Sequence, residues 1–350
     1  MSGGRFHRLR IASLRRDTPD SVVLGFSVPE ALRAAYRFTP GQFVTLRAEI
    51  GGVSCRRPYS ICSDPGAAEL LVGIRLVPGG RFSTWANAVP AVGDALEVMT
   101  PDGRFGLAPE PGARRSLLFC AAGAGITPIL SILRATLARE AGRCILLYAN
   151  RARAAIMFRD EIDALKDRYL DRLALVHLLS RETVEGALAG RLDAPTLARL
   201  RAGLGAATVA HAFLCGPEGF AAALAPALAD AGRLHREVFT PAPDAAPAAA
   251  PMAADAPPAA WAEVTFQGVR SRIPLAAGEN IVAAGERAGL DLPHACRGGM
   301  CCTCRAMLTA GQVTMATNYS LEPWELAAGY VLTCQASAVS AEVAVDYDRM

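Results

Sequence analysis

Four cysteines in the last quarter of the sequence have the spacing of an iron–sulfur site. They follow the pattern C-x4-C-x2-C-x29-C, and they are Cys296, Cys301, Cys304 and Cys334. A C-x4-C-x2-C…C spacing is typical of plant-type [2Fe–2S] clusters, which are held by four thiolates. The alternative is a structural zinc site, but such sites usually have two separated C-x2-C pairs and only one is present. The pattern therefore predicts a [2Fe–2S] cluster, with Cys302 as a bystander.

A second group of residues, RPYS, has the chemistry of a flavin site. Its members come at the end of a predicted strand and are Arg57, Pro58, Tyr59 and Ser60. A flavin ring needs an aromatic face and a small hydroxyl near N5, and a flavin phosphate needs a guanidinium. Tyr59, Ser60 and Arg57 offer these three groups. Any surface strand could carry so short a motif, so the prediction depends on the motifs around it.

The downstream segment GGRFSTWANA has the form of a phosphate site. A glycine turn at Gly79 and Gly80 leads through Phe82 into a predicted helix. The N-terminus of a helix binds phosphate, and we expect Ser83 to be both the N-cap and a ligand. The alternative is an ordinary hairpin followed by an N-capped helix.

A third motif, AAGAGITP, lies between a predicted strand and a predicted helix. Gly123 and Gly125 permit close approach of a pyrophosphate, and Thr127 is placed to cap the helix. After the next strand, Asn150 and Arg151 occur where dinucleotide-binding folds often have an acidic residue. Arginine suits a 2′-phosphate, so the sequence favours NADPH over NADH. An arginine that only faces solvent is the alternative.

A fourth motif, CGP, follows the last strand of this region. Cys215, Gly216 and Pro217 come at the carboxyl end of a predicted strand, where open α/β sheets bind ligands. We expect Cys215 to lie against a nicotinamide. The alternative is a buried small apolar residue, which is the interpretation of the other cysteines outside the cluster.

The elements that must position these motifs show three kinds of pattern. Residues 5–108 contain short Val-, Phe-, Leu- and Thr-rich runs broken by Gly and Pro, which favours an antiparallel barrel. From residue 116 to 231, apolar strands alternate with helices, which indicates a parallel sheet with helical crossovers. Residues 241–260 contain only Ala and Pro apart from two Asp and one Met, so we expect an extended linker.

Composition and charge narrow the class of protein. The net charge of +3 is too small to predict binding to nucleic acid or to an anionic membrane. The uncharged run from Ser116 to Leu133 contains the glycine turn of AAGAGITP, so a strand and helix explain it better than a membrane span. Ten cysteines without a secretory leader favour a reducing compartment. We therefore expect a cytoplasmic protein that binds neither nucleic acid nor membrane.

Taken in order, RPYS, GGxxS, GAGITP, CGP and the cysteine cluster resemble the ferredoxin–NADP reductase superfamily. The C-terminal ferredoxin looks like that of the reductase components of bacterial multicomponent oxygenases. RFSTWAN, YANR, CRGGMCCTC, NYSLEPWE and GYVLTCQ look most like the reductase subunits of phenylacetyl-CoA 1,2-epoxidases. Related reductases of ring-hydroxylating and steroid oxygenases share the layout. The resemblance covers nearly the whole chain except the linker.

The resemblance implies a multidomain electron-transfer protein. Residues 1–110 would form a flavin-binding antiparallel β-barrel, and residues 111–240 an α/β parallel-sheet NAD(P)-binding domain. After the linker at 241–260, residues 261–350 would form an α+β, β-grasp-like [2Fe–2S] ferredoxin domain. Electrons would pass from NAD(P)H through FAD and the cluster to an oxygenase component. The alternatives are a stand-alone NAD(P)H:acceptor reductase and a redox-sensing regulator.

The same resemblance implies roles for the motif residues. Arg57 and Ser83 would hold the flavin phosphates, Tyr59 would stack on the ring and Ser60 would face N5. In the nucleotide domain, the nicotinamide would lie between Thr127 and Cys215, and the adenosine half would meet Asn150 and Arg151. Glu237 loosely matches an acidic residue near the flavin in some relatives.

Overall fold

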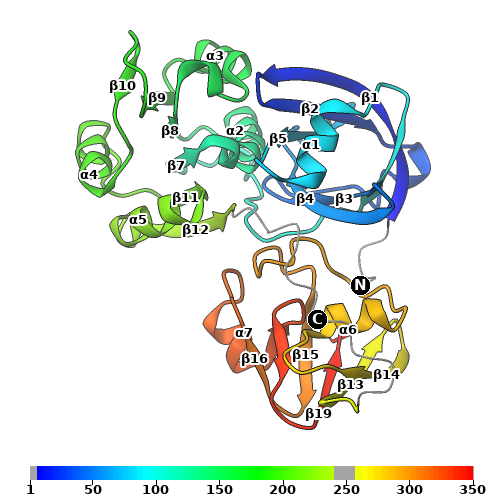
Figure 1. Cartoon of the computed structure of the whole chain (residues 1–350). Coiled ribbons are helices and arrows are strands. Elements are labelled where there is room, and N and C mark those ends of the chain that lie inside the picture. Colours follow the sequence, from blue (N-terminus) through cyan, green and yellow to red (C-terminus); the bar gives the residue numbers. More distant parts are fainter. Residues whose placement is uncertain (1–5, 240–256, 350) are drawn as a thin grey trace. The chain divides into compact units, whose positions relative to one another are not determined.

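The structure is a computed structural model that describes residues 6–239 and 257–349 (Figure 1). Most of the linker predicted at 241–260 lies outside these residues. The chain divides into two compact units. The larger unit contains two sheets, coloured blue to cyan and cyan to green in Figure 1, and the smaller unit contains a third, coloured yellow to red.

The first sheet of the larger unit is antiparallel and closes on itself. Its six strands run in the order β4-β3-β6-β1-β2-β5. Their bounds are β1 Phe6–Thr18, β2 Ser21–Ser27, β3 Phe43–Ile50, β4 Val53–Ser60, β5 Leu70–Arg75 and β6 Ala95–Met99. A bridge from Ile61 to Val72 joins the residues after β4 to β5. Helix α1 (Arg81–Ala88) packs against β3 and β5. The predicted antiparallel barrel is confirmed.

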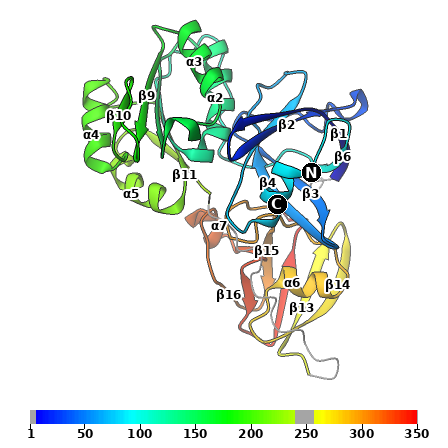
Figure 2. The same ribbon diagram turned by 45° about the horizontal axis from the view of Figure 1, so that its top comes forward.

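The second sheet is parallel and has helices on both faces. Its strand order is β10-β9-β8-β7-β11-β12. The strands are β7 Leu117–Ala122, β8 Cys144–Asn150, β9 Leu173–Leu179, β10 Ala187–Ala189, β11 His211–Gly216 and β12 Arg233–Val238. The helices are α2 Ile126–Arg139, α3 Arg159–Arg168, α4 Ala194–Gly203 and α5 Glu218–Leu228. Figure 2 shows α2 and α3 on one face and α4 and α5 on the other. Because both faces are covered, β7 and β8 are apolar almost throughout.

The strand order of this sheet reverses between β7 and β11. The chain runs outward from β7 through β8 and β9 to β10, and then returns to add β11 and β12 on the other side of β7. In open α/β sheets such a reversal leaves a crevice beyond the carboxyl ends of the strands, where ligands bind. The fold therefore places the candidate nucleotide site at the ends of β7 and β11.

The smaller unit contains a mixed five-stranded sheet in the order β14-β13-β19-β15-β17. Its strands are β13 Ala260–Phe266, β14 Val269–Leu275, β15 Arg305–Ala310, β17 Tyr330–Leu332 and β19 Glu342–Asp346. Strands β16 (Val313–Met315) and β18 (Ala336–Ala338) form a separate pair, and the helices are α6 (Ile281–Arg287) and α7 (Pro323–Ala327). The residues between α6 and β15 have no regular structure and contain three of the four cysteines of the motif, while Cys334 follows β17. The predicted α+β fold is confirmed.

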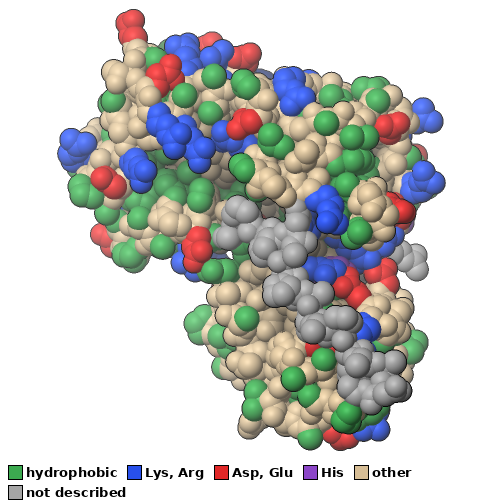
Figure 3. All heavy atoms as spheres, in the orientation of Figure 1, with side chains coloured by type: hydrophobic (Ala, Val, Ile, Leu, Met, Phe, Trp, Pro, Cys, Tyr) green, Lys and Arg blue, Asp and Glu red, His purple; other side chains and the backbone are tan. Residues whose placement is uncertain are grey.

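Some charged side chains on the larger unit form ion pairs with one another. On the face shown in Figure 3, Lys and Arg side chains are mixed with Asp and Glu. Several pairs join different elements, such as Arg75 with Asp20 at 2.9 Å and Arg139 with Asp64 at 2.9 Å.

In the part of the chain that the structure describes, no helix is long and apolar enough to cross a membrane.

Candidate functional site

The two motifs predicted to bind a nucleotide meet at the carboxyl ends of adjacent strands. Ala121 of β7 pairs with Cys215 of β11. A Cβ atom on Gly125 would lie only 2.3 Å from the carbonyl oxygen of Cys215, so the turn can approach this strand only as glycine. On the other strand, a Cβ on Gly216 would lie 2.9 Å from the Cβ of Ala122. AAGAGITP and CGP therefore form one surface at the strand-order reversal.

The first turn of α2 corrects one prediction. The helix begins at Ile126 with Gly125 as its N-cap, and Gly123 has a φ of 53° in the turn before it. The Thr127 hydroxyl donates to the carbonyl oxygen of Ala124 at 2.9 Å, so Thr127 is not the predicted cap. The prediction was wrong because a cap must accept a backbone N–H, and Thr127 already lies inside the helix. The first N–H groups of α2 are thereby left without a side-chain partner from the cap.

A buried thiol and a carboxyl group lie side by side at this edge. Cys215 is paired in register with Glu237 of β12, and its Sγ lies 3.9 Å from Glu237 Oε2. Although part of the Glu237 side chain reaches solvent, burial of the carboxyl raises its pKa to about 8, and the thiol contact lowers it only in part. Burial and this neighbour also raise the pKa of the Cys215 thiol. Both shifts favour the neutral forms near pH 7, which suits a site beside an uncharged or cationic ring.

The end of β8 provides a buried amide and an exposed guanidinium. Asn150 is 8% exposed, and among the described residues neither of its amide atoms has a hydrogen-bond partner. Arg151 is exposed. Arg181, two residues after the end of β9, was missed by sequence reasoning. Its N–H donates to the Arg151 carbonyl at 2.9 Å, so the two arginines come from neighbouring strand ends. The signal that could have found it is its position after a parallel strand.

The flavin motifs are also brought together. The rings of Tyr59 and Phe82 lie 5.5 Å apart at 41°, so the end of β4 meets α1. Ser60 is buried beside Tyr59, and Arg57 and Pro58 precede them on β4.

Helix α1 corrects a second prediction. It begins at Arg81 with Gly80 as N-cap, so Ser83 is its third residue and not the cap. The Ser83 hydroxyl instead holds the preceding turn: it accepts from Val77 N at 3.1 Å and donates to Gly80 O at 3.1 Å. The prediction was wrong because the glycine turn itself leads into the helix. The Ser83 side chain therefore shapes the helix N-terminus that would face a phosphate.

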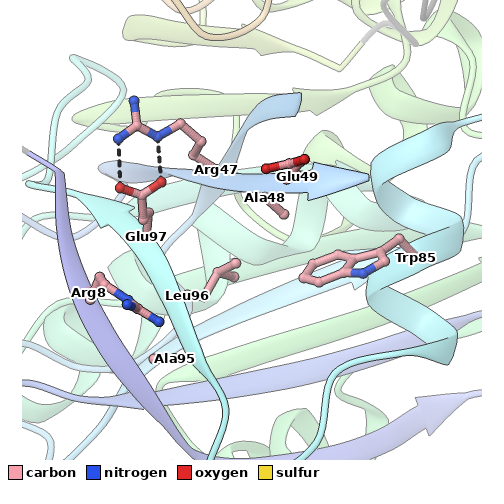
Figure 4. Close-up of a pocket in the computed structure, with 8 residues that line it drawn as sticks. All are labelled: Arg8, Arg47, Ala48, Glu49, Trp85, Ala95, Leu96 and Glu97. Atoms are coloured by element: carbon pink, nitrogen blue, oxygen red, sulfur yellow. Dashed lines mark hydrogen bonds and ion pairs between the residues drawn. The ribbon is translucent and has the colours of Figure 1, made fainter. Parts of the chain in front are cut away.

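The cavity in Figure 4 lies elsewhere on the barrel. It has a volume of about 380 Å³ and is lined by residues of β1, β3, β6 and α1. Two of its lining residues are already paired, because Arg47 donates to both carboxylate oxygens of Glu97 at 2.7 and 2.6 Å. None of the residues predicted to bind flavin or nucleotide lines it.

In the smaller unit, the four predicted ligands are buried and meet as two pairs. The Cys301 thiol hydrogen-bonds to Cys296, and together with the N–H groups of Gly298 and Met300 it lowers the pKa of Cys296 to about 6. In the same way, the Cys304 thiol lowers the pKa of Cys334. Within residues 6–239 and 257–349, no three metal-ligating side chains are placed to hold a single ion. Two pairs of thiols fit a cluster of two irons, each iron being held by two thiolates.

The fifth cysteine of the motif has a different partner. Cys302 has a φ of 58°, and its thiol donates to the Ser320 hydroxyl at 3.0 Å. It therefore takes part in the packing of the loop.

Comparison with known proteins assigns a domain type to each part of the chain. Residues 9–106 match an oxidoreductase FAD-binding domain, residues 119–225 an oxidoreductase NAD-binding domain, and residues 264–339 a 2Fe-2S iron-sulfur cluster binding domain. The chain is 40% identical over 351 residues to a subunit of the 1,2-phenylacetyl-CoA epoxidase of Escherichia coli (strain K12), covering 98% of both chains. The chain belongs to the reductase components of multicomponent oxygenases.

A second curated relative and one solved structure match almost the whole chain. The ferredoxin reductase component of 3-ketosteroid-9-alpha-monooxygenase from Rhodococcus rhodochrous is 33% identical, with 99% of this chain and 98% of that protein covered. The solved structure of phthalate dioxygenase reductase shares the fold, with a TM-score of 0.59 at 23% identity and 97% and 98% coverage. The predicted family and the predicted FAD, pyridine-nucleotide and [2Fe–2S] domains are confirmed.

Proposed function

We propose that this reductase carries electrons from NADPH through FAD and its [2Fe–2S] cluster to the oxygenase component of a phenylacetyl-CoA epoxidase. The contact between Gly125 and Cys215 supports the first part most strongly, because it builds a nucleotide surface at the strand-order reversal. The full-length likeness to the Escherichia coli epoxidase protein supports the acceptor. FAD, when bound, takes a hydride from the nicotinamide and releases electrons singly to the cluster.

The barrel residues would bind and orient the flavin. Tyr59, which is backed by Phe82, would stack on the ring. Buried Ser60 would place its hydroxyl near N5. Arg57 would neutralise a phosphate of the flavin. Pro58 lies between Arg57 and Tyr59 and would restrict the backbone of β4 there.

The start of α1 would bind the other side of the flavin phosphates. The turn at Gly80 leaves the first N–H groups of this helix without carbonyl partners inside the helix. Because Ser83 holds that turn closed, it would act on the phosphates through the helix N-terminus.

The parallel-sheet residues would bind the nicotinamide nucleotide. Gly123 and Gly125 would let the backbone approach the pyrophosphate, while Thr127 and Cys215 would lie on either side of the nicotinamide. Gly216 and Pro217 would shape the opposite wall, where Pro217 is the N-cap of α5. The neutral Cys215 thiol would add no charge next to the ring.

The choice of NADPH over NADH depends on the arginines at the ends of β8 and β9. Arg151 and Arg181 are both exposed, and their backbones are hydrogen-bonded at 2.9 Å. Two guanidinium groups at one edge match the charge of a 2′-phosphate, and the buried amide of Asn150 would face the adenosine.

In the smaller unit, Cys296 and Cys301 would hold one iron, and Cys304 and Cys334 the other.

We further propose the domain bounds 1–110, 111–240 and 261–350 with the linker at 241–260, and a cytoplasmic location. All ten cysteines lie in the described residues and none forms a disulfide, which supports a reducing compartment.

An anaerobic visible titration of the full chain tests the electron path. We expect NADPH to bleach the flavin and iron–sulfur bands in turn, and NADH to do so at higher concentration. A cluster that stays oxidised after the flavin is reduced would contradict the path, and an NADH preference would contradict only the arginine assignment.

The steroid relative defines a second candidate acceptor. NADPH oxidation should therefore be compared with purified oxygenase components of phenylacetyl-CoA epoxidase and 3-ketosteroid-9-alpha-monooxygenase. We expect coupled turnover with the epoxidase component. Equal or faster turnover with the steroid component would reject that assignment while keeping the reductase function.

A further inference from the structure

Phe158 has a backbone conformation that its residue type does not favour. It is the N-cap of α3, it is 1% exposed, and its φ and ψ are 56° and 29°. This left-handed region is uncommon for bulky side chains and persists only where the surroundings impose it. The contacts of Phe158 therefore hold it in place.

The backbone of Phe158 is held by the barrel. Its N–H donates to Asp17 Oδ2 of β1 at 2.9 Å. Asp17 also pairs with Arg15 at 2.8 Å, and Arg15 contacts Glu161 of α3 while its guanidinium lies 5.6 Å from the centre of the Phe158 ring. One barrel strand thus fixes both the N-terminus of α3 and the side chain at its cap.

The ring of Phe158 fills a point where three elements meet. A Cβ atom on Gly73 of β5 would lie 2.8 Å from Cζ and 3.0 Å from Cε2 of Phe158. It would also lie 3.0 Å from Cγ2 of Thr127, in the first turn of α2. The ring, the barrel backbone and the Thr127 methyl are therefore packed against one another without spare volume.

Tyr148 links the residue before Phe158 to the glycine turn after β7. The Tyr148 hydroxyl donates to the carbonyl oxygen of Gly123 at 3.0 Å and lies 3.5 Å from the carbonyl oxygen of Met157. The residue before Phe158 and the turn after β7 thus share one partner. A shift of Phe158 would move the Gly123–Thr127 turn relative to β5.

We propose that Phe158 is a positioning residue for hydride transfer, whose ring sets the spacing between β5 of the flavin barrel and the nucleotide turn at Gly123–Thr127. This rests on the proposed function. In that reaction, with both groups bound, the nicotinamide C4–H bond would break and an N5–H bond would form on the flavin, so that NADPH is oxidised to NADP⁺ and the flavin is reduced by two electrons. Because small displacements slow such a transfer strongly, loss of the ring should lower the rate more than the affinity.

Stopped-flow flavin reduction of the full chain tests this proposal. For Phe158→Leu at saturating NADPH, we expect a fall of about tenfold or more in the rate, with a change of less than about threefold in the NADPH dissociation constant. The isotope effect with NADPH deuterated at the transferred position should rise. The matched control is Phe26→Leu, an equally buried phenylalanine of the barrel core on β2, which should keep the wild-type rate.

A second variant approaches the same contact from the barrel. Gly73→Ala should also slow flavin reduction, because its Cβ would push on the ring. In the double variant Gly73→Ala/Phe158→Leu, the smaller side chain leaves room for the Cβ, so the two effects should be clearly less than additive. Flavin content and the iron–sulfur bands of all variants should match the wild type.

The outcomes of these experiments distinguish the positioning role of Phe158 from the proposed electron-transfer function. If the wild type is reduced by NADPH and Phe158→Leu is reduced at the same rate, the positioning role is rejected. Fully additive effects of the two substitutions would reject it too. If the flavin-loaded wild type is reduced by neither NADPH nor NADH, the proposed function itself fails.

Discussion

The cluster loop and the nucleotide edge build their sites in opposite ways. In the cluster loop, three of the four ligands lie within nine residues, between positions 296 and 304, and their thiols provide the chemistry. The nucleotide edge is assembled from the ends of β7, β8, β9 and β11, and Gly125 there packs so close to the Cys215 carbonyl that no Cβ would fit. The first site depends on side-chain identity, whereas the second depends on the absence of side chains and on sheet topology.

Cysteine side chains in the two regions have environments that shift the thiol pKa in opposite directions. The neighbouring Cys301 thiol, together with backbone N–H groups, lowers the pKa of Cys296 to about 6, which favours a thiolate ligand. Burial beside Glu237 raises the pKa of Cys215, which keeps its thiol neutral. Cysteine is therefore a metal ligand in one place and a small uncharged wall in the other.

The largest effect should come from removing a ligand in the cluster loop. We expect Cys304→Ser to abolish the iron–sulfur absorbance and to lower electron transfer to the oxygenase by more than about 100-fold, because metal binding and folding of such sites are coupled. Flavin reduction by NADPH should be unchanged. The matched control is Cys302→Ser, which should retain the cluster because Cys302 contacts Ser320 and lies outside the two thiol pairs. Retention of a normal cluster in Cys304→Ser would contradict the assignment.

The next largest effect should come from adding one carbon atom at the nucleotide edge. Gly125→Ala would place a Cβ 2.3 Å from the Cys215 carbonyl oxygen, so the turn must move. We expect flavin reduction by NADPH to fall on the order of 100-fold, with a loss of about 1–3 kcal/mol in stability. The cluster spectrum after chemical reduction should be normal. Gly203→Ala, at the end of α4 with no atom within 4 Å of the added carbon, is the control and should behave as wild type.

This contrast also explains how much could be predicted from the sequence. The cluster ligands follow from their spacing: three of them lie in one loop, and the fourth, Cys334, lies in the turn that follows β17. The barrel and the parallel sheet follow from the periodicity of their strands. AAGAGITP and CGP could be assigned to strand ends, but their contact depends on β11 being inserted next to β7, which no local pattern specifies.

Other features needed the structure for physical reasons. Ser83 and Thr127 look like caps from their residue types, but the helices begin earlier, because Gly80 and Gly125 occupy the cap positions. Arg181 lies thirty residues after Arg151 in the sequence and joins it only through the pairing of β8 with β9. The role of Phe158 depends on its contact with Gly73, which is more than eighty residues away in the sequence.

The smallest effect should come from the carboxyl group beside Cys215. The pKa of Glu237 is about 8 in the folded chain against 4.5 for an ordinary glutamate, so between these values the folded state holds a proton that the unfolded state has lost. The stability of the larger unit should therefore fall as pH rises from about 4.5 to 8, by at most about 5 kcal/mol over that range. Glu237→Gln should remove most of this slope and make the protein more stable than wild type at pH 8. Urea unfolding followed by flavin fluorescence at pH 5.5 and 8 measures this difference.

Glu218→Gln, which removes an exposed carboxylate at the start of α5, controls for charge and should leave the slope unchanged. Parallel pH profiles for wild type and Glu237→Gln would show that the carboxyl is ionised in the folded chain, and the neutral wall beside the nicotinamide would then be wrong.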